Sequence, residues 1–189
     1  MSIHLQSFFL TCKIFTYYRV NIMDQFIKAI EQSISNENWY SALFVALSIP
    51  DICGKLESPK TKSTDRYINW IRRYLTPKYI SDKDQYEFLR PSDCYALRCA
   101  FLHEGRDQID EQRCREVLQR FRFVKPRPGL IVHCNIKNEV VLQLQVDIFC
   151  RDICDGVRQW LNNIVNNADI QARMTEMMKI ESFNDVISL

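Results

Sequence analysis

Apolar residues recur at helical spacing through the first half of the chain. From Asp24, a suitable N-cap, they return every three or four positions, and a second such segment follows Asn36 and ends at Pro50. A third begins at Ser63 or its neighbour and ends at Pro77. The stripes consist of Phe26, Ile27, Ile30, Ile34, Trp39, Leu43, Phe44, Leu47, Tyr67, Ile68, Ile71, Tyr74 and Leu75. This pattern predicts three amphipathic helices that share a core.

A fourth helix is predicted after Pro91, with Ser92 as its cap and Gly105 at its C-terminal end. Between Cys94 and Leu102 the only charged residue is Arg98, so this helix has no clearly solvated face. We therefore expect it to be buried on most sides.

The period then changes to two over residues 120–146. The alternating apolar residues are Phe121 and Phe123 in one strand and Leu142, Leu144 and Val146 in another. Between the strands lie the turn-forming residues Pro126, Pro128, Gly129 and Asn138. We predict a small antiparallel hairpin or sheet of two or three strands. Helical spacing returns from Asp147, and a last short helix holds Ile170, Met174, Met177 and Met178.

The predicted fold class is mainly α: an antiparallel helical bundle with a small antiparallel β insertion. A chain of 189 residues with 47% hydrophobic residues and only four Gly fits one domain, placed at 23–180 with a tail at 181–189. The net charge of +2 does not by itself demand a nucleic-acid partner, so a basic site has to come from local clustering.

Residues 1–22 are treated as an N-terminal extension. Their aromatic and aliphatic run faintly resembles the apolar core of a signal peptide, but Lys13 interrupts it and no basic segment precedes it. The favoured alternative is that translation starts at Met23, which gives a cytoplasmic protein without a membrane partner.

Eight cysteines lie mostly within apolar helical or strand patterns, where a free thiol behaves as a small hydrophobic group. Cys150 and Cys154 share a helix face, but no nearby motif supplies the two further ligands that zinc needs. We therefore expect a reducing compartment and neither a metal nor another cofactor.

An Arg within an apolar helix must extend to solvent, pair with an acid, or face a cleft or subunit interface that holds an anion. In this chain the arginine within an apolar helix is Arg98. His103 lies five residues on, which places it about 140° around an ideal helix and off the same line. We expect a neighbouring chain to bring the two side chains together.

The string Leu97-Arg98-Cys99-Ala100-Phe101-Leu102-His103 resembles the Arg-x4-6-His signature of the HEPN superfamily. A wider similarity to a plasmid-type bacterial HEPN family covers most of residues 24–165. The resemblance implies a helical bundle and a homodimer in which Arg98 and His103 of both copies meet. It also implies metal-independent cleavage of single-stranded RNA, a toxin or phage-defence role and an antitoxin partner. Many HEPN nucleases have a polar residue directly after the Arg, whereas this chain has Cys99.

The residue types suit that chemistry. Imidazole titrates near pH 6.5, so His103 can take a proton from a ribose 2′-hydroxyl or give one to the leaving 5′-oxygen, and Arg98 can stabilise the phosphate. Supporting candidates are Glu104, Asp93 and Cys99. Asp51 and Glu57 are further acids that can orient His103 or pair with Arg98, although structural roles are favoured for all these acids.

A basic cluster between Arg113 and Arg127 is the candidate RNA-binding surface. Its members are Arg113, Arg115, Arg120, Arg122, Lys125 and Arg127, interleaved with Phe121 and Phe123; Arg120, Arg122, Lys125 and Arg127 are the preferred contacts. A solvated strand face explains the same residues equally well. Two other functions stay open: an RNA- or nucleotide-binding module that does not cut, and an assembly protein in which Arg98 pairs across subunits.

Overall fold

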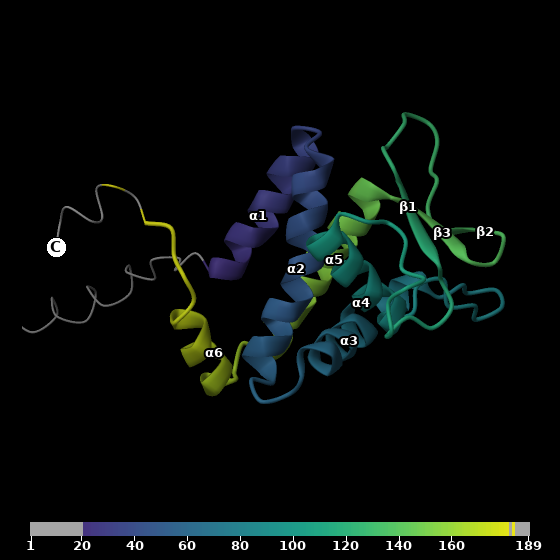
Figure 1. Cartoon of the computed structure of the whole chain (residues 1–189). Helices are drawn as coiled ribbons and strands as arrows, with labels where there is room; N and C mark the ends of the chain where they lie inside the picture. The colour runs from purple at the N-terminus through teal and green to yellow at the C-terminus, as the bar shows by residue number, and fades with distance from the viewer. Residues whose placement is uncertain (1–20, 182, 184–189) are drawn as a thin grey trace, which may run out of the picture.

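The computed structural model describes residues 21–181 and 183 (Figure 1). The helices are α1 (Ile22–Ser35), α2 (Trp39–Glu57), α3 (Ser63–Tyr74), α4 (Pro91–Cys99), α5 (Val146–Ile164) and α6 (Ala168–Thr175). Thr76–Tyr79 forms a 3-10 turn and Ala100–Glu104 a π-helical turn. The strands are β1 (Arg120–Val124), β2 (Asn135–Lys137) and β3 (Val141–Gln145). The mainly helical class with a small β insertion is confirmed.

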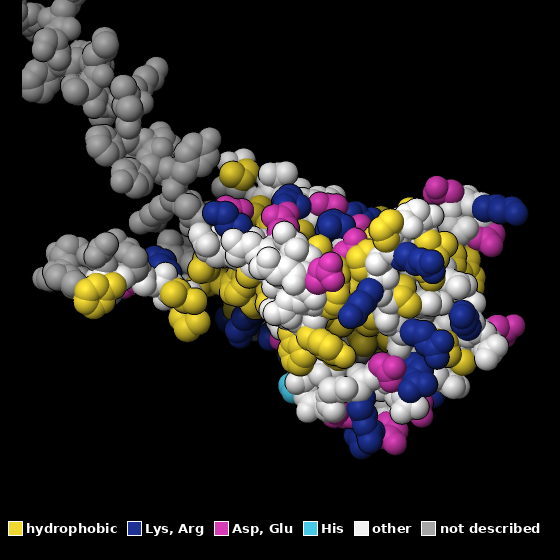
Figure 2. Space-filling model, turned by 90° about the horizontal axis from the view of Figure 1, so that it is seen from above, with side chains coloured by type: hydrophobic (Ala, Val, Ile, Leu, Met, Phe, Trp, Pro, Cys, Tyr) yellow, Lys and Arg dark blue, Asp and Glu magenta, His cyan; other side chains and the backbone are white. Residues whose placement is uncertain are grey.

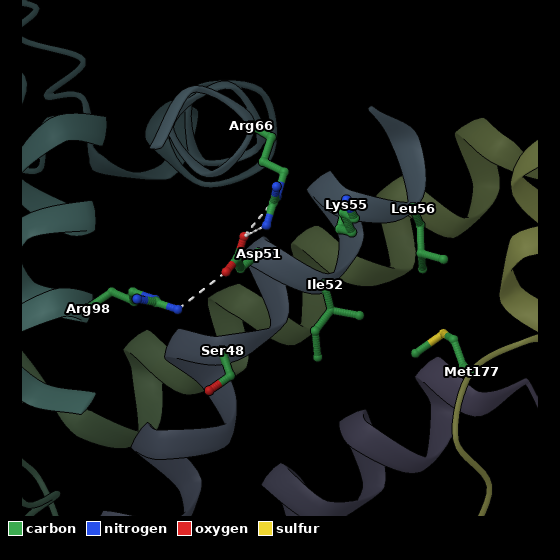
Figure 3. A pocket seen from close by; sticks show the side chains of 8 residues that line it. All are labelled: Ser48, Asp51, Ile52, Lys55, Leu56, Arg66, Arg98 and Met177. Carbon is green, nitrogen blue, oxygen red and sulfur yellow. Dashed lines mark hydrogen bonds and ion pairs between the residues drawn. The ribbon is translucent and has the colours of Figure 1, made fainter. Parts of the chain in front are cut away.

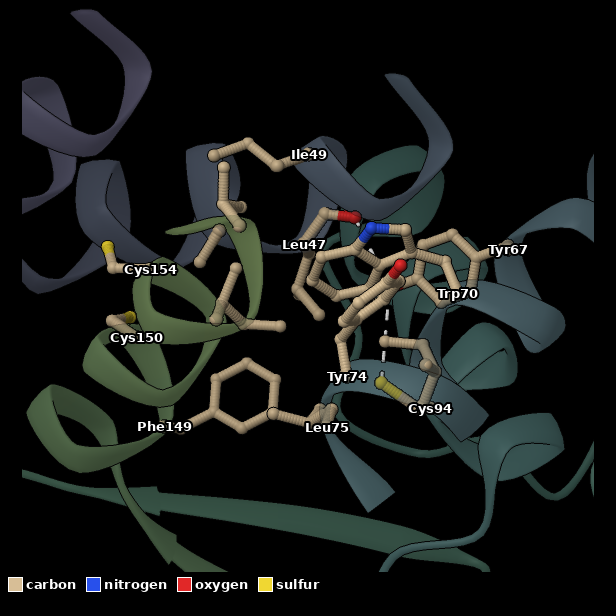
Figure 4. Packing of buried hydrophobic residues seen from close by; sticks show 14 of the residues in the cluster. Leu47, Ile49, Tyr67, Trp70, Tyr74, Leu75, Cys94, Phe149, Cys150 and Cys154 are labelled. Atoms are coloured by element: carbon tan, nitrogen blue, oxygen red, sulfur yellow. Dashed lines mark hydrogen bonds between the residues drawn. The ribbon is translucent and has the colours of Figure 1, made fainter. Parts of the chain in front are cut away.

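Helix α2 lies at the centre of the helical part and contacts α1, α3, α5 and α6. Burying apolar side chains from several helices around one central helix supplies most of the stability of such a fold. Figure 4 shows the core between α2, α3, α4 and α5, which includes Leu47, Trp70 and Phe149. All three side chains are at most 1% exposed.

The helix ends differ in part from the sequence prediction. Asn21, not Asp24, caps α1 with its side chain, and Asn38, not Asn36, caps α2. Pro50 lies inside α2 and does not end it. Proline lacks an N–H and costs the helix one hydrogen bond, but Pro50 is buried, and packing on both sides outweighs that loss.

At α4 the predicted cap was also wrong. The N-cap position is Arg90, Pro91 starts the helix, and the hydroxyl of Ser92 donates to Glu116 rather than to the helix backbone. Proline suits the first helical position because the N–H that it lacks would have no helical partner there. Gly105 ends the following π turn with φ +67°, as its position predicted.

The sheet corrects the prediction of an antiparallel insertion. Its order is β1-β3-β2; β2 and β3 form an antiparallel pair, but β1 and β3 run parallel. Residues 125–134 lead from β1 to β2 on the far side of β3. β1 therefore forms no hairpin with β2, the strand that follows it in the chain. In this loop Pro126 and Pro128 cannot donate to a strand ladder. β3 continues directly into α5 and joins the sheet to the helices.

The short last helix is confirmed with a correction at its end. Ile170 and Met174 are buried in α6, whereas Met177 and Met178 follow the helix. Among the described residues, no helix is both long enough and apolar enough to span a membrane. The predicted N-terminal extension covers residues 1–22, of which only 21 and 22 are described, and the predicted tail covers residues 181–189, of which only 181 and 183 are described. Both stay predictions.

Candidate functional site

Helix α2 and helix α3 cross closely at Gly54, and this crossing builds one wall of the site. A Cβ atom at Gly54 would lie 3.0 Å from the backbone oxygen of Arg66, closer than most Cβ contacts, so glycine favours this approach. The crossing brings the side chain of Arg66 to Asp51 of α2. Arg66 Nε and Nη2 each lie 2.9 Å from Asp51 Oδ1, and the hydroxyl of Ser63 donates to the same carboxylate.

Asp51 also binds Arg98. Nη2 of Arg98 lies 3.2 Å from Asp51 Oδ2, so one carboxylate holds two guanidinium groups from α3 and α4 (Figure 3). The Arg98 side chain is 17% exposed and that of Asp51 20%, which makes this a half-shielded ion pair at the protein surface. Of the three options for an Arg in an apolar helix, Arg98 pairs with an acid of its own chain.

Arg98 and His103 are in direct contact. Nη1 of Arg98 lies 2.9 Å from Nε2 of His103, whose side chain is exposed. The expectation that a neighbouring chain is needed to bring them together was therefore wrong. Arg98 lies in α4 and His103 in the π turn Ala100–Glu104, so the segment that joins them is not an ideal α-helix.

The chemistry of the guanidinium group sets the direction of this contact. A guanidinium group only donates hydrogen bonds, so Nη1 of Arg98 donates and Nε2 of His103 accepts. Nε of Arg98 is buried and has no hydrogen-bond partner in the described structure. All three guanidinium nitrogens of Arg98 are thus accounted for: one on Asp51, one on His103 and one unsatisfied.

A shallow groove of about 450 Å³ runs past this cluster. It is lined by Ser48, Asp51, Ile52, Lys55, Leu56, Arg66, Arg98 and Met177 (Figure 3). Three cations and one carboxylate leave its lining with a formal charge of +2. A groove of this charge suits an anionic ligand.

Tyr67 lies beneath the site and ties α3 to both neighbouring helices. Its hydroxyl lies 3.3 Å from the backbone oxygen of Leu47 and 3.9 Å from Sγ of Cys94. Burial raises the pKa of Tyr67 well above its usual value, and the nearby Cys94 adds to this. Tyr67 therefore stays neutral and acts as a fixed hydrogen-bonding group in the wall behind Arg98.

The supporting residues predicted from sequence lie elsewhere. Asp93 is fully buried, and its carboxylate accepts backbone N–H groups from residues 116–118. Glu104 accepts from the side-chain amide of Gln112, 3.0 Å away. Cys99 is half-buried near Cys114, whose pKa is raised by burial and by that neighbour. None of the three bonds to Arg98 or His103 within the described residues.

The basic cluster is a surface of its own and does not line the groove. Arg122, Lys125 and Arg127 are exposed on β1 and the loop after it, while Nε of Arg120 lies 3.1 Å from Asp107. Several Lys and Arg side chains lie on the side where Figure 1 places the sheet, interspersed with hydrophobic and acidic ones (Figure 2). The structure is compatible with either interpretation of this cluster.

Cys150 and Cys154 of α5 are the cysteines that share a helix face. Cys150 and Cys154 are buried, and burial raises the pKa of Cys154 to about 12. Across residues 21–181 and 183 no three His, Cys, Asp or Glu side chains gather in a way that could hold a metal ion.

Sequence reasoning missed Arg66, Ser48 and Lys55, and it favoured a structural role for Asp51. Arg66 carries no distinguishing signal, since α3 also contains Arg72 and Arg73. Asp51 was recognisable as an acid within an apolar stretch, but only the packing of α3 between α2 and α4 decides that its partner is Arg98. Glu57, the other acid considered, pairs with Arg73 at 2.7 Å.

Comparisons with protein-family models, with curated proteins and with solved structures found no match to this chain.

Proposed function

We propose that this protein is a metal-independent endoribonuclease of the HEPN type that cleaves single-stranded RNA. The observation that carries the proposal is the 2.9 Å contact between His103 Nε2 and Nη1 of Arg98, which itself lines a charged, solvent-accessible groove. A guanidinium and a neutral imidazole provide phosphate binding and proton transfer, which are the two requirements for cleavage through a ribose 2′-hydroxyl.

In the proposed reaction, a phosphate oxygen of the RNA replaces His103 on Nη1 of Arg98. This frees Nε2 of His103 to take the proton of the 2′-hydroxyl. The 2′-oxygen bonds to phosphorus, the bond to the 5′-oxygen breaks, and an acid protonates that oxygen. The products are a 2′,3′-cyclic phosphate and a 5′-hydroxyl end. Arg98 stabilises the additional negative charge on the phosphate oxygens during this step.

The acid is proposed to be His103 of a second copy. One neutral imidazole serves as base, and a protonated one at the same phosphate serves as acid, which favours a homodimer with a shared groove. A symmetric dimer joins identical surfaces about a twofold axis, so residues near that axis meet their own copies. Analytical ultracentrifugation tests this arrangement: a monomer at assay concentration that still cleaves RNA would contradict it.

A second candidate function is RNA or nucleotide binding without cleavage. It is favoured by the engagement of both terminal nitrogens of Arg98, on Asp51 and on His103. A ligand phosphate that only added to this cluster would leave His103 bonded to Arg98 and unable to act as a base.

Incubation of labelled single-stranded RNA with the purified full-length protein in EDTA separates these functions. We expect cleavage by the wild type and a loss of about 10²–10⁴-fold in Arg98→Ala and His103→Ala. Arg72→Ala, at an exposed arginine bonded to Asn69, is the matched control and should cleave normally. RNA retention without cleavage by the wild type would support the binding module, and cleavage by His103→Ala at the wild-type rate would exclude the proposed mechanism.

The biological role proposed from the resemblance is that of a cytoplasmic toxin or phage-defence effector with an antitoxin partner. Expression in growing cells tests it. Growth arrest with the wild type and normal growth with His103→Ala would support a toxin, and equal growth with both would speak against it.

A further inference from the structure

One face of α2 carries a continuous stripe of unlike side chains. Phe44, Ser48, Asp51 and Lys55 follow one another at intervals of four, three and four residues, which places them on one line along the helix. Ser48, Asp51 and Lys55 line the groove beside Arg98. Phe44 extends the same line by one turn, so an aromatic ring adjoins the charged groove.

The ring of Phe44 is unusually exposed for a phenylalanine on a central helix. It remains 42% exposed, although its centroid lies only 4.6 Å from that of Phe101. Phe101 belongs to the π turn and stands two residues before His103. The contact therefore fixes the exposed ring next to the segment that presents His103.

The spacing along α2 suits one nucleotide. Asp51, which binds Arg98, lies seven residues after Phe44, or about 10 Å along the helix axis. At the Asp51 end the lining has a formal charge of +2, which suits a phosphate, while the Phe44 end offers an aromatic face. An unpaired nucleotide has the same two parts: an anionic phosphate and a flat base with a π-face.

We propose that Phe44 is a nucleobase-stacking subsite for the RNA whose phosphate binds at Arg98. This inference rests on the proposed function and adds to it the contact that receives a base. Stacking accepts any base, so the subsite selects unpaired RNA and excludes duplexes, whose bases are already stacked. A second copy of the chain on the same face is the rival occupant.

Short RNA oligomers with 2′-fluoro riboses test the subsite, because they lack the attacking hydroxyl and cannot be cleaved. One oligomer carries the fluorescent base 2-aminopurine and a matched one carries an abasic position at the same place. We expect the wild-type protein to quench 2-aminopurine and to bind the base-bearing oligomer more tightly. Phe44→Leu, which keeps the apolar contact with Phe101, should weaken that binding about 5- to 30-fold and leave the abasic oligomer unaffected.

Tyr86→Leu is the matched control. Tyr86 is 44% exposed and pairs with Phe88 at 5.2 Å between ring centroids, but it lies away from the groove lining. It should bind both oligomers as the wild type does. Thermal unfolding of both variants checks that each is folded.

The outcomes separate the two proposals. Wild-type affinity of Phe44→Leu for the base-bearing oligomer would overturn the stacking subsite, and normal cleavage of unmodified RNA by that variant would leave the ribonuclease proposal standing. A loss of the dimer in Phe44→Leu with unchanged base preference would assign the face to a second copy. Failure of the wild type to bind or cleave any RNA would overturn both proposals.

Discussion

The two ends of α4 are each held by an aspartate, but in opposite ways. At the N-terminal end Asp93 is fully buried, and its carboxylate accepts three backbone N–H groups of residues 116–118. At the C-terminal end Asp51 of α2 remains 20% exposed and holds Arg98 and Arg66. Backbone N–H groups satisfy the carboxylate of Asp93, whereas the carboxylate of Asp51 binds side-chain cations that a ligand can reach.

This difference separates a structural site from a candidate functional one. Backbone N–H groups that bind a buried carboxylate cannot exchange it for an external ligand without losing the fold. Side-chain cations on a surface carboxylate can be shared with a phosphate at a small cost, because water and the ligand both compensate them. We therefore expect mutations of Asp93 to affect mainly stability and mutations of Asp51 to affect mainly function.

The largest effect is expected for Asp93→Ala. Removing the carboxylate leaves buried N–H groups without partners, so the free energy of unfolding should fall by about 3 kcal/mol. Urea denaturation followed by circular dichroism measures it. Asp110→Asn, at an exposed aspartate, is the control and should change stability by less than about 0.5 kcal/mol. A loss below about 1 kcal/mol for Asp93→Ala would remove the contrast between the two ends.

At the other end, Asp51→Asn should reduce stability by about 1 kcal/mol, as expected for a partly exposed ion pair. Its larger effect should be functional, because Asp51 positions Arg98. We expect the KM for RNA to change less than kcat, since the cations stay in place but Arg98 is no longer held toward the groove. Steady-state kinetics of Asp51→Asn and Asp51→Glu check this, and partial rescue by Glu is expected. Equal activity of wild type and Asp51→Asn would refute the positioning role.

The π turn at the C-terminal end can be tested at Gly105. Its φ of +67° strains any residue with a Cβ atom, although the space around it is open. Gly105→Ala should therefore lower the free energy of unfolding by about 1 kcal/mol. Gly105→Asn is the matched variant, because asparagine tolerates this conformation better and should lose less. Equal losses in the two variants would show that conformational strain is not the cause.

The smallest effect is expected at Glu116, beside the N-terminal end of α4. The hydroxyl of Ser92 and the guanidinium of Arg90 hold the pKa of Glu116 below its usual 4.5. Its contribution to stability is therefore complete above about pH 4.5 and is lost as the pH falls through the lowered pKa. Glu116→Gln should be slightly less stable than the wild type at pH 7 and equal to it in acid. Thermal unfolding at pH 7 and pH 3 measures this, and a constant difference would contradict it.

The sequence predicted the helical elements well because they depend on local periodicity. The stripe from Phe149 to Ile164 is buried along α5, and Gly105 ends the segment after α4 as its type suggests. The failures share one cause, which is that packing between distant segments overrides local sequence signals. Pro50 stays within α2 because packing outweighs a lost hydrogen bond, and β1 runs parallel to β3 because strand order depends on how the chain returns across the sheet.

By itself the sequence determined that this chain folds as helices with a short β insertion. It also distinguished Arg98, as a charge within an apolar stripe, and His103, as the second member of the Arg-x4-6-His pattern. Only the tertiary structure decided that the two side chains touch, that Asp51 and Arg66 complete their cluster, and that Asp93 serves the loop instead. The reason is physical: periodicity reports which side of a helix is buried, whereas the contacts of Arg98 depend on how α2, α3 and α4 are placed relative to one another.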